Sequence, residues 1–152
     1  MSPFKSRLQS DLTEAIRSRD ELVSSTLRLT LTAITNEEVA GKTARELSDD
    51  EVLKVIVREA KKRREAAEAF ENGGRTESAA RERAEGEVLA AYLPAQLSDD
   101  ELKVIVADAI AETGASGPQA MGQVMKVVRP KVGDKAEGGR IAAEIKSQLG
   151  TT

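Results

Sequence analysis

Apolar residues recur every three or four positions along most of this chain, which is the spacing of one face of an α-helix. The first stripe lies near the N-terminus and consists of Leu8, Leu12, Ala15 and Ile16. A second segment, which Asp20 can cap, carries apolar residues at Val23, Leu27, Leu31 and Ile34. Residues 4 to 93 contain no proline, so this part of the chain can form long helices.

One stretch of the second segment also fits a β-strand. Residues 26–32 alternate strictly between leucine and a polar residue and are rich in threonine, which is typical of strands. A strand needs a neighbour to satisfy its backbone hydrogen-bonding groups, and no second strand-like segment lies nearby in the sequence. We therefore expect a helix at this position.

Two similar motifs mark the starts of later helices. Ser48 and Ser98 each precede Asp-Asp-Glu, so that Ser48 with Glu51 and Ser98 with Glu101 can form capping boxes. The acidic residues also suit the positive end of the helix dipole. The helix that Ser48 opens is expected to run to the Asn-Gly-Gly stop at 72–74, with its apolar face at Val52, Ile56, Ala60, Ala67 and Phe70.

The rest of the pattern predicts four further helices and one boundary. A helix from about Thr76 is expected to bury Ala80, Ala84, Val88 and Tyr92, and the next one follows Ser98. Pro94 disfavours helix at Leu93 and marks a boundary between them. A short helix that starts with Pro118 is expected to close before Pro130, and Ile141, Ile145 and Leu149 line the last helix. The sequence thus predicts an all-α protein with an N-terminal helical domain of about four helices (1–93) and a C-terminal three-helix domain (96–150).

The amino-acid composition excludes several kinds of catalytic and metal-binding site. The 152 residues include no His, no Cys and no Trp, which excludes thiol nucleophiles, disulfides, Cys- or His-ligated metals and imidazole catalysis. The Asp and Glu pairs sit at predicted caps and exposed faces, so we identify no catalytic residue, no metal site and no cofactor. Apolar runs are far shorter than the roughly 20 residues of a membrane span, which predicts no membrane association and a cytoplasmic location.

The net charge of −3 is a sum of opposed segments. Residues 53–64 hold six basic residues and one acid, residues 118–150 hold six basic residues and three acids, and residues 96–117 hold one basic residue and five acids. Basic clusters can bind the phosphates of RNA, and the candidate RNA-binding residues are Arg58, Lys61, Lys62, Arg63, Arg64, Lys126, Arg129, Lys131, Lys135 and Arg140. For the first cluster, the simpler interpretation is an ordinary solvated helix face with ion pairs at i+3 and i+4.

The segment 130–140 has two interpretations as well. Its glycines, two lysines and arginine at the start of a helix would suit a backbone phosphate. It is not a P-loop, because the Gly-Lys-Ser/Thr ending is missing, and it could equally be a flexible connection. The chain has only Tyr92, Phe4 and Phe70 as aromatic residues, which argues against base stacking as a binding mode. We therefore expect any RNA to be recognised by its shape and backbone.

Several short motifs stand out in the C-terminal half: the Tyr-Leu-Pro-Ala-Gln-Leu run at 92–97, Thr-Gly-Ala at 113–115, and Met-Gly-x-Val-Met at 121–125 with Pro-Lys at 130–131. The N-terminal half adds Arg-Leu at 28–29, Asn-Glu-Glu at 36–38 and the basic run 61–64. In this order the motifs resemble the YqeY-like family, whose members are related to the C-terminal tail of the GatB component of the glutamine-dependent tRNA amidotransferase. The resemblance covers about residues 4 to 149 and implies the same two helical domains, the second resembling the tail module that contacts tRNA.

The resemblance also implies what the chain could do and where it departs from its relatives. Many relatives have Lys where Gln123 stands, so the short sixth helix here has one positive charge fewer. Our hypothesis is a non-catalytic module that binds tRNA or another structured RNA, alone or beside the amidotransferase or tRNA-charging machinery. The alternatives are a protein-interaction adaptor, or an accessory part of a carbon–nitrogen ligase with glutamine as amido-N-donor, an activity implied by the resemblance alone.

Overall fold

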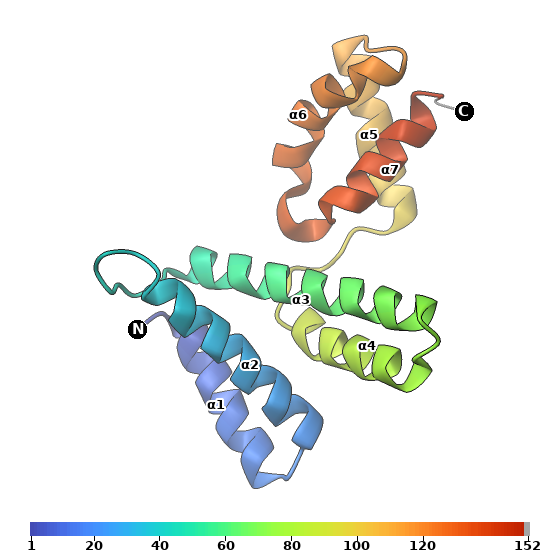
Figure 1. Cartoon of the computed structure of the whole chain (residues 1–152). Coiled ribbons are helices and arrows are strands. Elements are labelled where there is room, and N and C mark those ends of the chain that lie inside the picture. Colours follow the sequence, from blue (N-terminus) through green and yellow to red (C-terminus); the bar gives the residue numbers. More distant parts are fainter. Residues whose placement is uncertain (151–152) are drawn as a thin grey trace. The chain divides into compact units, whose positions relative to one another are not determined.

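The protein is described from a computed structural model, which covers residues 1–150 and, at Pro118, only the backbone. Within this range the regular structure is entirely helical, which confirms the all-α prediction (Figure 1). The chain divides into two compact units, Met1–Leu93 and the part from Pro94 onward. The elements in order are α1 (Pro3–Arg17), α2 (Glu21–Glu38), α3 (Asp49–Asn72), α4 (Thr76–Ala90), α5 (Asp99–Thr113), the 3₁₀-helix η1 (Pro118–Ala120), α6 (Met121–Val132), the 3₁₀-helix η2 (Gly133–Lys135) and α7 (Gly138–Gln148).

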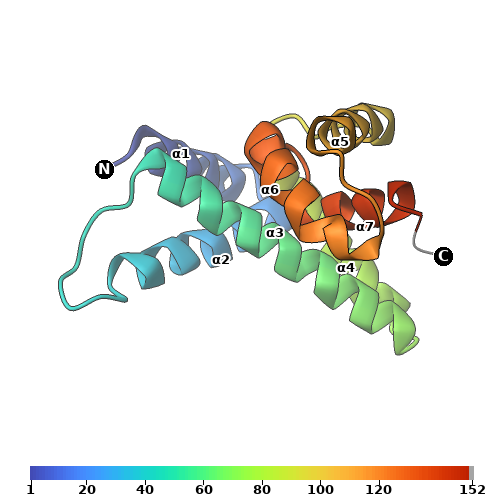
Figure 2. The ribbon, with the colours of Figure 1, turned by 90° about the horizontal axis from the view of Figure 1, so that it is seen from above.

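The first unit consists of two helical hairpins, α1–α2 and α3–α4. Figure 2 shows α1 and α2 on the two sides of the N-terminal half of α3, and both contact it. The core that joins the hairpins contains fully or almost fully buried residues from all four helices and from the loop before α3, namely Leu8, Leu27, Ile34, Leu47, Val52, Val55, Ile56 and Leu89. Each of these side chains is at most 3% exposed, so burial of this shared core holds the hairpins together.

The threonine-rich stretch is helical, as expected, and its threonines are accommodated inside α2. Thr26 and Thr30 are fully buried. Their hydroxyls donate hydrogen bonds to the carbonyls of Leu22 and Thr26, each at 2.8 Å. Because the hydroxyls find partners on the preceding turn, burying them leaves neither hydroxyl unsatisfied.

Both capping boxes are confirmed, with the glutamate N–H groups 3.3 and 3.1 Å from the hydroxyls of Ser48 and Ser98.

The residues that α4 buries lie one position before or after those predicted, and the predicted Ala84 and Val88 are only half-buried. The residues it buries are Ala79, Glu85 and Leu89, whereas Ala80 is exposed. Tyr92 lies beyond the end of the helix, half-buried, and its hydroxyl donates a 2.6 Å hydrogen bond to Asp11 of α1. The prediction followed only apolar spacing, and it missed that an ion-paired glutamate occupies the buried face.

The second unit is a three-helix bundle of α5, α6 and α7. Its core is aliphatic and comes from all three helices, with Leu102, Val106, Val124, Val128, Ile141 and Ile145 each at most 2% exposed. Gly114 ends α5 in the left-handed conformation with φ 64°, as a C-terminal glycine does most easily.

The prediction that the sixth helix closes before Pro130 is wrong. Pro130 lies inside α6, which continues to Val132. Proline has no N–H to donate to the carbonyl of the residue four positions earlier, so one helical hydrogen bond is missing. The ring of Pro130 is exposed to solvent. Continuing the helix buries Val132 to 2% exposure, and the N–H of Gly133 then bonds the carbonyl of Arg129. Burial of Val132 thus outweighs the missing hydrogen bond.

Candidate nucleic-acid interface

The basic run on α3 does not form one basic surface. Lys61 and Lys62 are exposed, but Lys61 lies 3.8 Å from Glu65 and Lys62 lies 3.0 Å from Glu59. Arg64 is half-buried and has its own partner. One turn earlier, Arg58 pairs with Glu37 of α2 at 3.3 Å. The cations of this run are therefore largely neutralised within the unit. The pairs of Lys61 and Lys62 are of the kind that the solvated-face interpretation predicts, whereas Arg58 pairs with a different helix.

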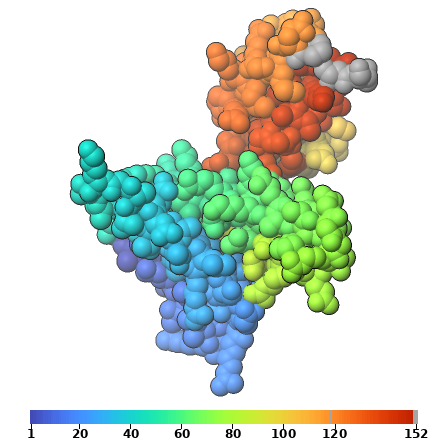
Figure 3. Space-filling model, in the orientation of Figure 1, coloured from blue at the N-terminus to red at the C-terminus, as the bar shows by residue number. Residues whose placement is uncertain are grey.

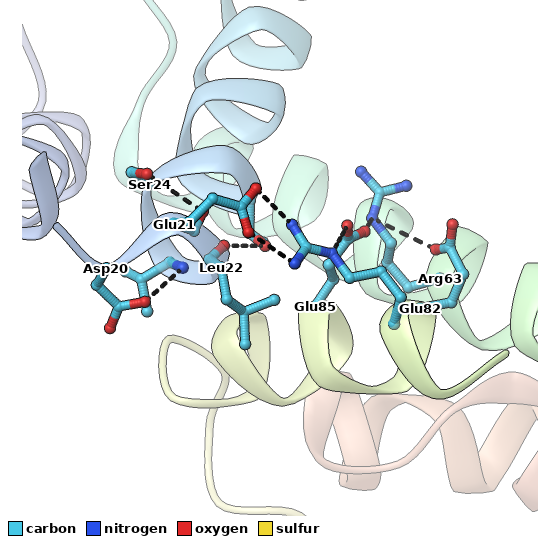
Figure 4. Close-up of polar contacts among 10 residues, drawn as sticks. Asp20, Glu21, Leu22, Ser24, Arg63, Glu82 and Glu85 are labelled. Atoms are coloured by element: carbon cyan, nitrogen blue, oxygen red, sulfur yellow. Dashed lines mark hydrogen bonds and ion pairs between the residues drawn. The ribbon is translucent and has the colours of Figure 1, made fainter. Parts of the chain in front are cut away.

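Arg63 points into the first unit rather than toward solvent. Its side chain is 14% exposed and converges with three glutamates, at 3.6 Å from Glu59 of α3 and 3.9 and 3.1 Å from Glu82 and Glu85 of α4. Figure 4 shows Arg63 beside the carboxylates of Glu82 and Glu85. A side chain that neutralises buried carboxylates is not available to phosphate, so Arg63 stabilises the α3–α4 hairpin.

A second arginine extends this network to α2. Arg81 of α4 lies 3.1 Å from Glu85 through Nε, and its two terminal nitrogens donate to Glu21 at 2.8 and 3.0 Å. Burial raises the pKa of Glu82, and the nearby Glu85 raises it further. The network joins both hairpins of the unit. Sequence reasoning missed it because Glu59, Glu82 and Glu85 look like ordinary exposed glutamates in a charged helix.

Two candidate cations of the second unit are also engaged. Lys131 pairs with Glu112 of α5 at 3.0 Å, on an exposed surface. Arg140 of α7 donates to the carbonyl of Leu97 at 2.8 Å and to Asp99 at 3.0 Å. These bonds attach α7 to the start of α5, so Arg140 is a structural residue of the bundle, whereas the exposed Lys131 pair can exchange partners easily.

Three candidate cations of the second unit remain exposed: Lys126, Arg129 and Lys135. Among residues 1–150, none of the three has an ion-pair partner within 4 Å. Lys126 and Arg129 lie one turn apart on the outer face of α6, and Gly122 lies one turn before Lys126. Figure 3 shows the surface that α6 contributes to this unit in orange. A Cβ at Gly122 would meet nothing within 4 Å, so the glycine leaves backbone open at this surface without any packing need.

Arg129 extends to the N-terminus of α7. Its Nη2 atom lies 3.2 Å from the position that a Cβ of Gly138 would occupy. The helix begins with Gly138 and Gly139, and no side chain caps its first N–H groups. The first amides of a helix lack intrahelical partners and carry partial positive charge. Arg129 and these amides therefore place positive charge between α6 and α7, beside the acidic N-cap residue Glu137.

Lys135 lies on the α5 side of this region, where its charge acts on the carboxylate of Glu101. Lys135 follows Asp134 at the end of η2, and its backbone carbonyl accepts a 2.8 Å bond from the N–H of Leu97. The pKa of Glu101 is lowered, chiefly by the backbone N–H and hydroxyl of Ser98 and in part by the charge of Lys135. We name Gly122, Lys126, Arg129, Lys135 and the α7 N-terminus the α6–α7 basic surface. Its chemistry suits phosphate oxygens, which accept from both guanidinium and backbone N–H groups.

The part of the chain that the structure describes offers neither a metal cluster nor a membrane span. Residues 1–150 contain no group of three or more carboxylates placed to hold a metal ion. No helix in this range is long and apolar enough to cross a membrane. The α6–α7 basic surface is the candidate site with the best-defined chemistry.

Comparison with known proteins gives the family. A family model described as Yqey-like protein matches residues 5–149. A protein of Pyrenophora tritici-repentis named "Altered inheritance of mitochondria protein 41, mitochondrial" is 30% identical over 134 residues, which are 84% of this chain and 72% of the fungal protein. An uncharacterised protein of Schizosaccharomyces pombe is 31% identical over 93 residues, covering 60% of this chain and 73% of that protein. The family model spans nearly the whole chain, and the chain therefore belongs to the YqeY-like family.

Proposed function

We propose that this protein is a non-catalytic module that binds structured RNA, with tRNA as the first candidate, through the α6–α7 basic surface. The observation that carries the proposal is a set of three exposed cations on α6 and η2: Lys126, Arg129 and Lys135. None of them has an ion-pair partner within residues 1–150. Arg129 also reaches the start of α7, which no side chain caps. Arginine, lysine and free helix amides are the groups that hold nucleic-acid phosphates.

The choice of RNA as ligand follows from the composition of the surface and from the resemblance. No aromatic residue occurs between Pro94 and Gly150, so bases cannot be stacked on rings there. Contacts would run to the sugar–phosphate backbone, which favours a folded RNA over an extended single strand. The likeness of residues 92–131 to the amidotransferase tail supports tRNA in particular.

A titration of labelled tRNA at about 50 to 200 mM salt tests the proposal. We expect the logarithm of the association constant to fall linearly with the logarithm of the salt concentration, because phosphates that the protein binds release their counterions. The double variant Lys126→Gln with Arg129→Gln removes two expected phosphate contacts. It should weaken binding about tenfold near 100 mM salt and reduce the salt slope by about 2.

The matched control is Lys61→Gln with Lys62→Gln, which removes the same charge from the neutralised run on α3. We expect this variant to bind tRNA almost as the unaltered protein does. Absence of binding at about 50 mM salt would contradict the proposal. Equal weakening by the two double variants would also contradict it, because affinity would then depend on total charge and not on the α6–α7 basic surface.

A further inference from the structure

The segment that carries Lys135 has little regular structure of its own. The 3₁₀-helix η2 is three residues long, Gly133 at its start has φ 56°, and Ala136 after it is extended. A single 3₁₀ turn forms few hydrogen bonds within itself. Ala136 is 5% exposed and belongs to the core of the unit, which fixes one end of the segment. The other contacts of η2 therefore decide where Lys135 is held.

The segment before α5 supplies these contacts. The side-chain amide of Gln96 donates to the carbonyl of Asp134 at 3.0 Å and to that of Pro94 at 3.1 Å. The backbone N–H of Leu97 donates to the carbonyl of Lys135 at 2.8 Å. Two successive carbonyls of η2 are thus bound by two successive residues of the segment before α5. We name these two bonds to η2 the η2 clamp.

Arg140 of α7 anchors the segment that forms the η2 clamp. Its guanidinium donates to the carbonyl of Leu97 at 2.8 Å. The side chain of Leu97 is half-buried against the core of the unit, so this residue is fixed by its backbone and by its side chain. Gln96 is exposed and contacts η2 through its side-chain amide. The bond from Gln96 is therefore the part of the η2 clamp that a substitution can remove without disturbing the core.

The position of η2 decides whether the charge of Lys135 is available to a ligand. Lys135 is exposed, has no ion-pair partner within residues 1–150, and lies close enough to Glu101 of α5 for its charge to act on that carboxylate. The first turn of α5 is acidic at all three positions 99–101. A mobile η2 would allow Lys135 to approach these carboxylates, and an ion pair there would compete with a phosphate.

We infer that Gln96 is a positioning residue, whose bond to η2 holds Lys135 at the α6–α7 basic surface for contact with an RNA phosphate. The inference rests on the proposed function, because Gln96 acts on the RNA only through Lys135. Gln96 carries no charge, so its effect on RNA affinity comes from the order of η2 and not from its own attraction to phosphate. The glutamine of the 92–97 run thus has a role in binding that its chemistry alone does not indicate.

Gln96→Met tests the inference in the full-length protein, because methionine keeps the length of the side chain but has no N–H to donate. The heteronuclear Overhauser effect of the ¹⁵N-labelled protein measures the order of residues 134–135 on the picosecond to nanosecond timescale, without any RNA. We expect lower values at these two amides in the variant. The circular dichroism spectrum should be unchanged, because Gln96 is exposed.

A tRNA titration then connects this order to binding. Lys135→Gln removes one expected phosphate contact and should weaken binding about threefold at about 100 mM salt, with a salt slope lower by about 1. Gln96→Met should weaken binding about twofold to threefold and lower the slope as well, although it changes no charge. Together the two substitutions should weaken binding no more than Lys135→Gln alone, because Gln96 acts through Lys135.

The matched control is Gln148→Met in the same unit. The side-chain amide of Gln148 also makes two hydrogen bonds, to the carbonyl of Lys103 and to the carboxylate of Glu144, both at 2.9 Å. The control loses the same donor group as Gln96→Met, but at the opposite end of α7 from η2. It should leave the tRNA affinity, the salt slope and the order of residues 134–135 unaltered.

Three results would overturn the role of Gln96 while the RNA proposal stands. They are unaltered order of residues 134–135 in Gln96→Met, unaltered tRNA affinity of that variant, and an effect that adds fully to that of Lys135→Gln. Equal weakening by Gln148→Met would overturn it too, since the loss of any such bond in the unit would then suffice. A failure of the proposed function is recognised separately, because the unaltered protein would then not bind tRNA at about 50 mM salt, and the role of Gln96 would fall with it.

Discussion

Replacing Arg63 by methionine removes a positive charge from the point where three carboxylates meet, while keeping most of the side-chain stem. The carboxylates of Glu59 and Glu85 are 9% and 10% exposed, and that of Glu82 is 21% exposed. Removing one partner of a fully buried ion pair costs about 3 to 5 kcal/mol, because the remaining charge is left uncompensated. Lys62 still lies beside Glu59 and Arg81 beside Glu85 in the variant. We therefore expect the lower limit, a loss of about 3 kcal/mol in the free energy of unfolding.

Urea unfolding followed by tyrosine emission measures this loss in the relevant unit. The chain has one tyrosine, Tyr92, and no tryptophan, so the signal comes from the first unit alone. The hydroxyl of Tyr92 donates to Asp11, and Arg7 lies 4.9 Å from the ring centroid, so unfolding changes its surroundings. Lys61→Met is the control on the same helix, and its exposed pair with Glu65 should contribute less than about 1 kcal/mol.

The pH dependence provides a second readout of the same variant. Burial raises the pKa of Glu82 above its ordinary value of 4.5, and the charge of Arg63 opposes this shift. Without Arg63 the pKa rises further, so the ionised carboxylate destabilises the fold above that pKa and ceases to do so once it is protonated. The deficit of Arg63→Met should therefore be smaller near pH 4.5, the ordinary pKa of the group, than at neutral pH. A deficit equal to that of Lys61→Met, or one independent of pH, would refute the reasoning.

Three further predictions concern other parts of the chain. Glu51→Gln should lower the urea midpoint at neutral pH, measured by tyrosine emission. Because the pKa of Glu51 is about 2, its contribution to stability is present above pH 4.5 and is lost as the pH falls toward 2. The stability of the variant should therefore fall less on acidification than that of the unaltered protein. Val128→Ala removes two buried methyl groups from the second unit and should cost about 2 kcal/mol, measured by circular dichroism at about 222 nm. Pro130→Ala should stabilise that unit by about 1 kcal/mol in the same measurement, because it restores an N–H donor for the carbonyl of Lys126; a loss of stability would show that proline suits this turn.

Local sequence signals were sufficient for the helices and for most of their ends. Ser48 and Ser98 form the capping boxes, and the Asn-Gly-Gly sequence at 72–74 ends α3, because each of these effects depends on atoms within a few residues. Helical spacing likewise identified Leu27, Ile34, Val52 and Ile56 as core residues of the first unit. Such features can be derived from the sequence because helical geometry fixes which neighbours meet.

Only the tertiary structure decided which charged residues are available to a ligand. Arg63 and Lys126 are both basic residues of predicted helices, yet the first is enclosed by glutamates of two helices and the second is exposed without a partner within the described residues. The burial of Glu85 and the continuation of α6 through Pro130 depend in the same way on packing between distant segments. The sequence by itself determined the helices, their caps and the absence of imidazole and thiol chemistry, all of which are local or compositional. Which cations remain free follows from which helix faces pack together, and that is a property of the folded chain alone.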